Sequence, residues 1–261
     1  TWLMLFEERM KLGMISSKPD SFYDYSNDYK NLAASVQSTL EEKITLEIKK
    51  WLNKTGLRNV CIAGGVGLNC TNNGKILTLN EVEQMFVQPA AGDAGVSLGS
   101  ALELAEQLGY KSIISHDFTS YLGVELDDGE IIQYLKDNNI RYKYVEGAEK
   151  YIAEKIAKDG IVAVFQGKNE WGPRALGNRS IISSANKGKR DIINAKVKNR
   201  ELGRPLAPSM LKEDFGFLNN NVKMFNEYMN VAYKAEQYLD EISSILHIDN
   251  TYSCLLYTSE A

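Results

Sequence analysis

The most regular pattern of hydrophobic and polar positions lies between residues 31 and 54. Apolar side chains recur there at every fourth position, and charged residues fill the opposite side of the period. This spacing places the apolar residues on one stripe of a helix. We therefore predict an amphipathic helix that ends near Gly56 and whose buried stripe consists of Leu32, Val36, Leu40, Ile44, Ile48 and Leu52.

Two short apolar runs that end in glycine turns come next. NVCIA leads into GGVGLN at 64–69, and VEQMFVQP leads into AAGDAG at 90–95. Apolar runs of this length are typical of buried strands, and a glycine turn lets the chain pass directly into a helix. We predict helices at 69–79 and 96–109 after these turns, and therefore an α/β fold for this part of the chain.

The second half of the chain repeats these signals more weakly. Residues 127–138 and 148–158 have helical periodicity, whereas IRYKYVE at 140–146 and IVAVFQG at 161–167 indicate strands. Between the two halves, residues 111–124 lose the pattern and carry turn-forming and polar residues, which is typical of a linker.

A further helix is predicted over residues 187–200. On this helix Ile193 and Val197 occupy an inner face, whereas Arg190, Asn194 and Lys198 share another face.

Composition limits the class of protein. The 261-residue chain is 44% hydrophobic and 25% charged, with a formal net charge of -4, which is typical of a soluble globular protein. Apolar runs stay well short of the roughly 20 residues that cross a bilayer, and the first residues do not resemble a signal peptide. We expect a cytoplasmic protein that binds neither membranes nor nucleic acid.

The cysteines and histidines offer no familiar catalytic or metal-binding pattern. Cys61, Cys70 and Cys254 lack CxxC spacing, so neither a disulfide framework nor a zinc site is indicated. His116 and His247 lack metal-ligand spacing and are expected to be surface or packing residues.

The stretch FQGKNEWGPRALGNRS at 165–180 is the strongest chemical signal. Arginine presents a planar fork of donors that suits phosphate or carboxylate oxygens, and glycine and proline impose a tight irregular backbone. The segment from Lys168 to Arg204 contains ten cationic residues and only three acidic ones. We predict a pocket for a polyanionic small molecule. The alternatives are a loop of solvated charges and a surface that binds nucleic acid. The negative net charge of the whole chain disfavours the nucleic-acid surface.

The glycine turns suggest a second site. Gly64, Gly65 and Gly67 would let backbone N–H groups approach a nucleotide, although GGVGLN is neither a Rossmann nor a P-loop motif and fits a simple tight turn as well. Asp93 stands at the mouth of the next helix. It is either a helix cap or a ligand for a divalent metal.

Taken in order, GGVGLN, GDAG, EWGPRALGNRS, KVKNRE and RPLAPS resemble the O-carbamoyltransferase family, and the resemblance covers roughly residues 11–251. It implies part of an actin- and sugar-kinase-like nucleotide-binding domain, expected at 1–115, followed by part of a YrdC-like α/β domain at 116–261. The sequence opens without methionine and closes with YSCLLYTSEA, so we expect a fragment whose last ten residues are an unrelated or artefactual translation.

The resemblance also implies an activity. Carbamoyl phosphate and ATP would react to carbamoyl adenylate with release of pyrophosphate, and the carbamoyl group would pass to a hydroxyl of a small-molecule or sugar acceptor. ATP and a divalent metal, iron or magnesium, are the implied cofactors, with Asp93 as a metal ligand, and we allow for a homodimer. The implied site residues are Arg174, Arg179, Arg200 and Arg204 as catalytic groups, Lys168, Lys196, Lys198 and Ser209 for substrate or ATP, and Gly64, Gly65, Gly67 and Asn69 for the nucleotide.

Two departures from the family pattern and two rival functions remain. Lys168 stands where the family commonly has arginine, and the family's pair of metal-binding histidines four positions apart is absent from this sequence. We therefore expect the 261-residue chain alone to be inactive. The rivals are a phosphotransferase of the same nucleotide-binding superfamily and a non-catalytic nucleotide-binding protein.

Overall fold

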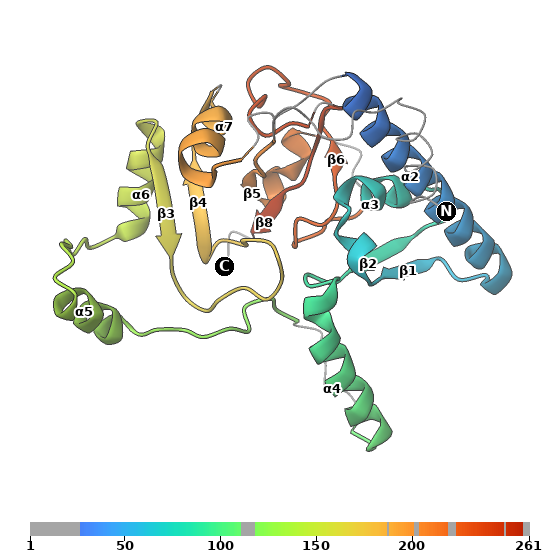
Figure 1. Ribbon diagram of the computed structural model, residues 1–261, viewed down its shortest axis with the longest axis horizontal. Coiled ribbons are helices and arrows are strands. Elements are labelled where there is room, and N and C mark those ends of the chain that lie inside the picture. The colour runs from blue at the N-terminus through green and yellow to red at the C-terminus, as the bar shows by residue number, and fades with distance from the viewer. Residues whose placement is uncertain are drawn as a thin grey trace. The chain divides into compact units, whose positions relative to one another are not determined.

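The computed structural model describes residues 27–110, 118–186, 188–200, 204–218, 223–247 and 249–257 (Figure 1). It divides into two compact units. The first contains the described residues up to Arg58 together with Leu79–Glu81, and the second contains Asn59–Thr78 and the described residues from Val82 onward. The mixed α/β class is confirmed, whereas the two predicted domains and their family assignments stay predictions.

The first unit is built on the long helix α2 (Asn27–Thr55), which confirms the periodic prediction. Leu52 is buried, but Val36 remains 43% exposed although it lies on the predicted stripe. Glu41 is buried instead, and its carboxylate accepts a hydrogen bond from Gln37 Nε2 at 2.7 Å.

The second unit begins with a parallel strand pair. Strands β1 (Asn59–Ile62) and β2 (Gln84–Val87) pair in register, with Ile62 opposite Val87. Both predicted strands are therefore confirmed, and because the pair is parallel, the two glycine turns leave the sheet at the same edge.

Short 3₁₀ turns connect these strands to the predicted helices. Turn η1 (Gly65–Leu68) follows β1 and precedes α3 (Cys70–Leu77), and turn η2 (Asp93–Gly95) follows β2 and precedes α4 (Val96–Gln107). Several residues of α3 are buried, but none of α4 is.

The middle of the chain forms an antiparallel strand pair preceded by two helices. Helices α5 (Asp128–Asp137) and α6 (Ala148–Ala157) match the predictions, and Figure 1 shows α6 beside β3 (Ile161–Phe165). Strand β3 pairs with β4 (Arg179–Ser183), whose residues the sequence analysis assigns in part to the basic loop.

The strand predicted at 140–146 is wrong. The chain there has no regular secondary structure, and Tyr142 and Tyr144 are exposed. Helix α5 is followed by Asn139 in the left-handed region, with φ 52°, and no described strand pairs with the segment. Aromatic and β-branched composition alone does not make a strand when a partner is missing.

The helix predicted at 187–200 forms, but its faces are not those predicted. A short helix α7 (Lys189–Ile192) continues as the π-helical segment η3 (Ile193–Lys198). Wider π-helical turns change the angular spacing of side chains. As a result Asn194 is fully buried beside Ile193, whereas Val197 is 46% exposed.

The last part of the chain contributes two further strand pairs. Strand β5 (Ser209–Leu211), followed by the 3₁₀ turn η4 (Lys212–Phe217), pairs with the parallel strand β8 (Leu255–Tyr257). Strands β6 (Tyr233–Lys234) and β7 (Thr251–Tyr252) pair antiparallel.

Residues 252–257 belong to the core of this unit. Tyr252 and Cys254 are fully buried, and Tyr252 lies 6.0 Å from Phe215 between ring centroids. Burial raises the pKa of the Cys254 thiol to about 12, so it stays protonated. The expectation that this ending is unrelated to the rest is therefore wrong for residues 252–257.

Within the described ranges, no helix is both long and apolar enough to span a bilayer.

Candidate functional site

A single carboxylate organises the basic stretch between β3 and β4. Glu170 Oε1 accepts hydrogen bonds from the backbone N–H groups of Leu176, Asn178 and Arg179, at 3.0, 2.8 and 3.0 Å. Partial burial raises the pKa of this carboxyl, but the backbone donors together lower it by more, so the net pKa lies below its usual value. Glu170 therefore holds this turn as a carboxylate.

Two tyrosines hold the same turn by donating hydrogen bonds to one of its carbonyl oxygens. The hydroxyl groups of Tyr121 and Tyr257 both donate to the carbonyl oxygen of Leu176, at 2.7 and 3.2 Å. Gly177 has φ 105°, and a Cβ there would collide with the Tyr257 hydroxyl. Glycine is thus required at this position by both backbone conformation and space.

The guanidinium group of Arg179 is engaged with its own loop. Nη1 donates to the carbonyl oxygens of Gln166 at 2.6 Å and Asn178 at 3.0 Å, and Nη2 donates to that of Gly167 at 3.1 Å. The group also lies 3.6 Å from the ring centroid of Phe165. Its Nε is buried and has no hydrogen-bond partner among the described residues. Its role as an anion ligand stays a prediction.

Arg174 lies in the same turn as Arg179 but has different surroundings. It is partly buried, and its Nε makes no hydrogen bond to the described part of the chain. Burial lowers the pKa of His247 below its usual 6.5; Asp249 acts in the opposite direction, and the charge of Arg174 lowers it further. The charge of Arg174 therefore acts on His247 although the two residues are far apart in sequence. The other histidine, His116, lies outside the described residues.

Asn194 links the remaining two predicted arginines. Its Oδ1 accepts from Arg200 Nε at 2.5 Å, and its Nδ2 donates to the carbonyl oxygen of Arg204 at 2.8 Å. The structure thus brings Arg200 and Arg204 to one buried amide, and Arg174 and Arg179 to one turn. Convergence of the two pairs on a single cleft stays a prediction.

The other predicted substrate residues lie at the surface. Lys168 precedes the Glu170 turn, Lys196 and Lys198 lie on η3, and Ser209 begins β5; all four are exposed. Exposed cations of this kind are adaptable but weakly positioned.

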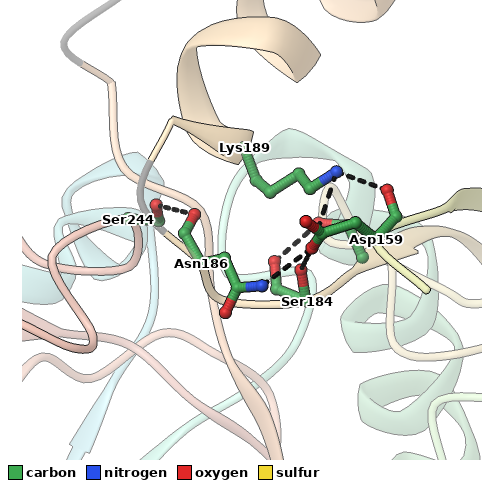
Figure 2. A network of polar contacts seen from close by, with 6 residues as sticks. Asp159, Ser184, Asn186, Lys189 and Ser244 are labelled. Atoms are coloured by element: carbon green, nitrogen blue, oxygen red, sulfur yellow. Dashed lines mark hydrogen bonds and ion pairs between the residues drawn. The ribbon is translucent and has the colours of Figure 1, made fainter. Parts of the chain in front are cut away.

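A polar network attaches the cation-bearing helix α7 to the β3–β4 pair (Figure 2). Asp159 Oδ1 accepts from Ser184 Oγ at 2.8 Å and from Asn186 Nδ2 at 2.7 Å, and Lys189 donates to the Asp159 carbonyl oxygen. Ser244 Oγ donates to the carbonyl oxygen of Asn186 at 2.7 Å. The hydrogen bonds from Ser184 and Asn186 lower the pKa of Asp159, which keeps it ionised opposite Lys189.

The two glycine turns touch each other. Gly64 N–H donates to the carbonyl oxygen of Ala91 at 2.7 Å, and a Cβ on Gly92 would lie 3.9 Å from Gly65 Cα. Gly67 is packed so closely that a Cβ there would lie 2.9 Å from Ala91 Cβ, whereas Gly64 and Gly65 border open space. Gly64 and Gly65 are therefore where a ligand could approach the backbone.

Asparagine side chains fix these turns. Asn69 Oδ1 accepts from the backbone N–H of Asn72 at 3.0 Å and thereby caps α3. Asn73 Nδ2 donates to the carbonyl oxygens of Gly67 and Asn230, each at 2.7 Å, and Asn230 Nδ2 donates to that of Val87 at 2.7 Å. Asn69 therefore serves as a helix cap, and its role at a nucleotide stays a prediction.

The basic loop packs directly against the second glycine turn. Gly172 has φ 116°, and a Cβ there would lie 2.6 Å from the carbonyl oxygen of Pro89. Trp171 N–H, beside it, donates to the carbonyl oxygen of Ser120 at 2.6 Å. The loop that carries Arg174 and Arg179 and the turn that carries Asp93 are therefore neighbours.

Asp93 by itself does not make a metal site. It is exposed and is the first residue of η2, and its side chain makes no capping hydrogen bond there. Within the described residues, no three histidine, cysteine or acidic side chains gather where they could hold a metal ion. A divalent ion needs several such ligands, so we derive no step through a metal.

Comparison with known proteins gives this arrangement a family. Residues 4–102 match the family model described as carbamoyltransferase N-terminus, and residues 153–258 match carbamoyltransferase C-terminus. This chain belongs to the O-carbamoyltransferase family. The C-terminal match extends through the buried residues 252–257, in agreement with their place in the core.

Proteins similar to this chain come from several bacteria. The nodulation protein NolNO of Sinorhizobium fredii is 35% identical over 87% of this chain and 34% of its own length. NolO of Bradyrhizobium diazoefficiens is 32% identical over 87% of this chain and 43% of its own length. The 3'-hydroxymethylcephem-O-carbamoyltransferase of Streptomyces clavuligerus is 31% identical over 76% of this chain and 36% of its own length. The chain thus spans between a third and a half of each.

Several residues of this site could not be singled out from sequence. The sequence marks Glu170 only as one of three acids in a basic stretch and places Asn194 on a helix face with Arg190 and Lys198, and it gives no sign that Asn73 and Asn230 are buried. The available signal for Glu170 was an acid inside a glycine-rich arginine loop, where an internal acceptor is needed for backbone N–H groups.

Proposed function

We propose that the protein carrying this chain is an ATP-dependent O-carbamoyltransferase. Carbamoyl phosphate, ATP and water give carbamoyl adenylate, phosphate and pyrophosphate, and a hydroxyl of a small-molecule or sugar acceptor then takes the carbamoyl group and releases AMP. Atom balance requires uptake of one water, since the pyrophosphate of ATP and the phosphate of carbamoyl phosphate both leave. Membership of the O-carbamoyltransferase family supports transfer to an acceptor, and the ATP-dependent route is part of the proposal.

The observation that carries the proposal is the packing of Gly172 against Pro89. It makes the arginine loop a neighbour of the glycine turns at the carboxyl edge of β1 and β2. Two polyanions that react together need fixed cations to offset their repulsion, and they need to be held close. The loop supplies cations, and the Gly64–Gly65 backbone supplies an open surface for a nucleotide.

We propose the following assignment of residues. The anionic groups are bound by cations. Among these cations, Arg174 has a buried Nε that donates no hydrogen bond to any described residue. The nucleotide lies against the glycine turns. The proposed cations are Arg174, Arg179, Arg200, Arg204, Lys168, Lys196 and Lys198, with Ser209 beside them and Gly64, Gly65, Gly67 and Asn69 at the nucleotide.

Isotope exchange between ATP and pyrophosphate in the full-length protein tests this function. The proposal expects exchange that depends on carbamoyl phosphate. A phosphotransferase of the same superfamily would act on ATP without carbamoyl phosphate, and a non-catalytic binding protein would show no turnover. Exchange that is indifferent to carbamoyl phosphate, or absent, would overturn the proposal.

The 261-residue chain alone is expected to be silent in carbamoyl transfer. Within its described residues the only proposed metal ligand is Asp93, and one carboxylate cannot hold a catalytic ion in a defined geometry. Transfer to a hydroxyl acceptor by the purified chain, at the rate of the full-length protein, would contradict this expectation.

A further inference from the structure

We propose that Glu170 is a positioning residue that sets the arginine loop in its anion-binding conformation. The inference rests on the proposed function for the identity of the anion. Its structural basis is independent of that function, because it consists of hydrogen bonds within the chain.

The loop needs an internal acceptor because of its backbone geometry. Gly172 and Gly177 have φ of 116° and 105°, so the backbone of this turn follows neither a helix nor a strand before β4 begins at Arg179. The N–H groups of Leu176, Asn178 and Arg179 point to one oxygen atom of Glu170 instead. Backbone donors that lose their acceptor away from water are costly, and an ionised acceptor binds them most strongly.

This arrangement fixes the arginines on either side of the acceptor. Arg179 itself donates one of the three N–H groups, and Arg174 lies inside the turn that Glu170 closes. The opposite side of the turn is held at the Leu176 carbonyl oxygen by Tyr121 and Tyr257. Glu170 thus acts on an anion through the arginines, and its own negative charge is satisfied by the backbone.

The decisive comparison is between Glu170→Ala and Glu170→Gln in the full-length protein. Glutamine keeps an oxygen where Oε1 lies, whereas alanine removes the acceptor. Arg174→Ala first identifies which KM, that for carbamoyl phosphate or that for ATP, depends on the loop. Glu170→Ala should then raise the same KM and lower kcat/KM roughly 10- to 100-fold, as expected for a displaced binding group. Glu170→Gln should lie within about fivefold of wild type, because neutral hydrogen bonds are weaker but still form.

A matched control separates this effect from general destabilisation. Glu130 also accepts a backbone N–H, that of Asp127 at 3.1 Å, but it does so in the capping box of α5. Glu130→Ala should loosen a helix end and leave both KM values unchanged. A folded Glu170→Ala protein with KM within twofold of wild type would overturn the proposal. So would a Gln variant that loses kcat as severely as Ala with an unchanged KM, which would indicate direct proton transfer instead.

Amide hydrogen exchange provides a readout that needs no activity. In wild type the amides of Leu176, Asn178 and Arg179 should exchange slowly as a group, and in Glu170→Gln all three should exchange at least about tenfold faster, in line with weaker acceptance. Exchange that changes at only one of them, or at none, would contradict the shared acceptor. If the wild-type protein shows no exchange between ATP and pyrophosphate that depends on carbamoyl phosphate, the proposed function fails. The amide hydrogen-exchange data still decide whether Glu170 organises the loop.

Discussion

At the scale of single residues, Arg174 and Arg179 occupy one turn but have different surroundings. Arg179 donates to carbonyl oxygens of Gln166, Gly167 and Asn178, so much of its hydrogen-bonding capacity is used within the loop. Arg174 shares its surroundings with the half-buried His247. Replacing each arginine should therefore have a different consequence.

We predict that Arg174→Ala mainly reduces activity and Arg179→Ala reduces both activity and stability. Loss of a cation that pairs with developing phosphate charge costs about 2–4 kcal/mol in the transition state. Arg179→Ala should also lower the free energy of unfolding by about 1–3 kcal/mol, because carbonyl oxygens lose a charged donor. Pyrophosphate-exchange rates and urea denaturation measure the two effects.

Arg141, exposed and outside the basic stretch, is the control for both arginine variants. Arg141→Ala should match wild type in both measurements. An Arg174→Ala protein within twofold of the wild-type rate would show that Arg174 is a surface charge and not an anion ligand.

His247 should make stability depend on pH. Its pKa is lowered in the folded protein, so below the usual value of 6.5 the unfolded chain binds more protons than the folded one. Stability should therefore fall as pH drops from about 7 toward the lowered folded pKa, and stay level below it. Urea denaturation of wild type and His247→Gln across this range is the measurement. An equal slope in both proteins would contradict the prediction.

At the scale of elements, the apolar patterns predicted the long helix and the positions of β1 and β2, although β1 is not buried, and they failed where tertiary partners decide. Helix α2 and the pair β1–β2 follow from their apolar patterns. The segment 140–146 has strand-like composition but no partner strand among the described residues, and β4 begins at Arg179 because β3 pairs with it. The local sequence pattern does not predict which strands will pair.

The site shows the same division. Glycine spacing and charge located the arginine loop and the two turns, because those features are local in sequence. The acceptor roles of the partly buried Glu170 and the buried Asn194 depend on the irregular turn and on the π-helical geometry of η3, which the sequence does not specify. Periodicity placed Asn194 on the face of Lys198, yet it is fully buried.

We predict that Asn194→Leu destabilises the cation-bearing segment. Asn194 connects Arg200 Nε to the Arg204 carbonyl oxygen, and removal of a buried hydrogen-bonding amide costs about 1–3 kcal/mol of unfolding free energy. The exposed Val197 on the same segment is the control, since Val197→Ala should stay within about 0.5 kcal/mol. Equal effects of the two substitutions in urea denaturation would contradict the π-helical burial of Asn194.

At the scale of the whole molecule, the account depends on one contact within the second unit. Gly172 places the arginine loop against Pro89, next to the turns that follow β1 and β2. Elements predicted for two different domains therefore contribute to one compact unit. Because the anion and the nucleotide must react with each other, the proposed shared site depends on this contact.

Gly172→Ala should lower the free energy of unfolding by more than backbone strain alone would. Both Gly172 and Gly188 have positive φ, at 116° and 88°, but only Gly172 has neighbouring atoms where a Cβ would lie. Gly188→Ala should cost about 1–3 kcal/mol of unfolding free energy through strain, and Gly172→Ala should add a further 1–3 kcal/mol, roughly, through overpacking. Equal losses in urea denaturation would show that the loop does not pack against Pro89.

The central claim, ATP-dependent activation of a carbamoyl group at this site, is tested most directly by the products formed from ATP. The full-length protein should be incubated with ATP and carbamoyl phosphate, and pyrophosphate, inorganic phosphate and ADP should be quantified together. The account predicts pyrophosphate and inorganic phosphate in equal amounts, only when carbamoyl phosphate is present, and a strong loss of both in Arg174→Ala. Formation of ADP in place of pyrophosphate, with or without carbamoyl phosphate, would contradict it.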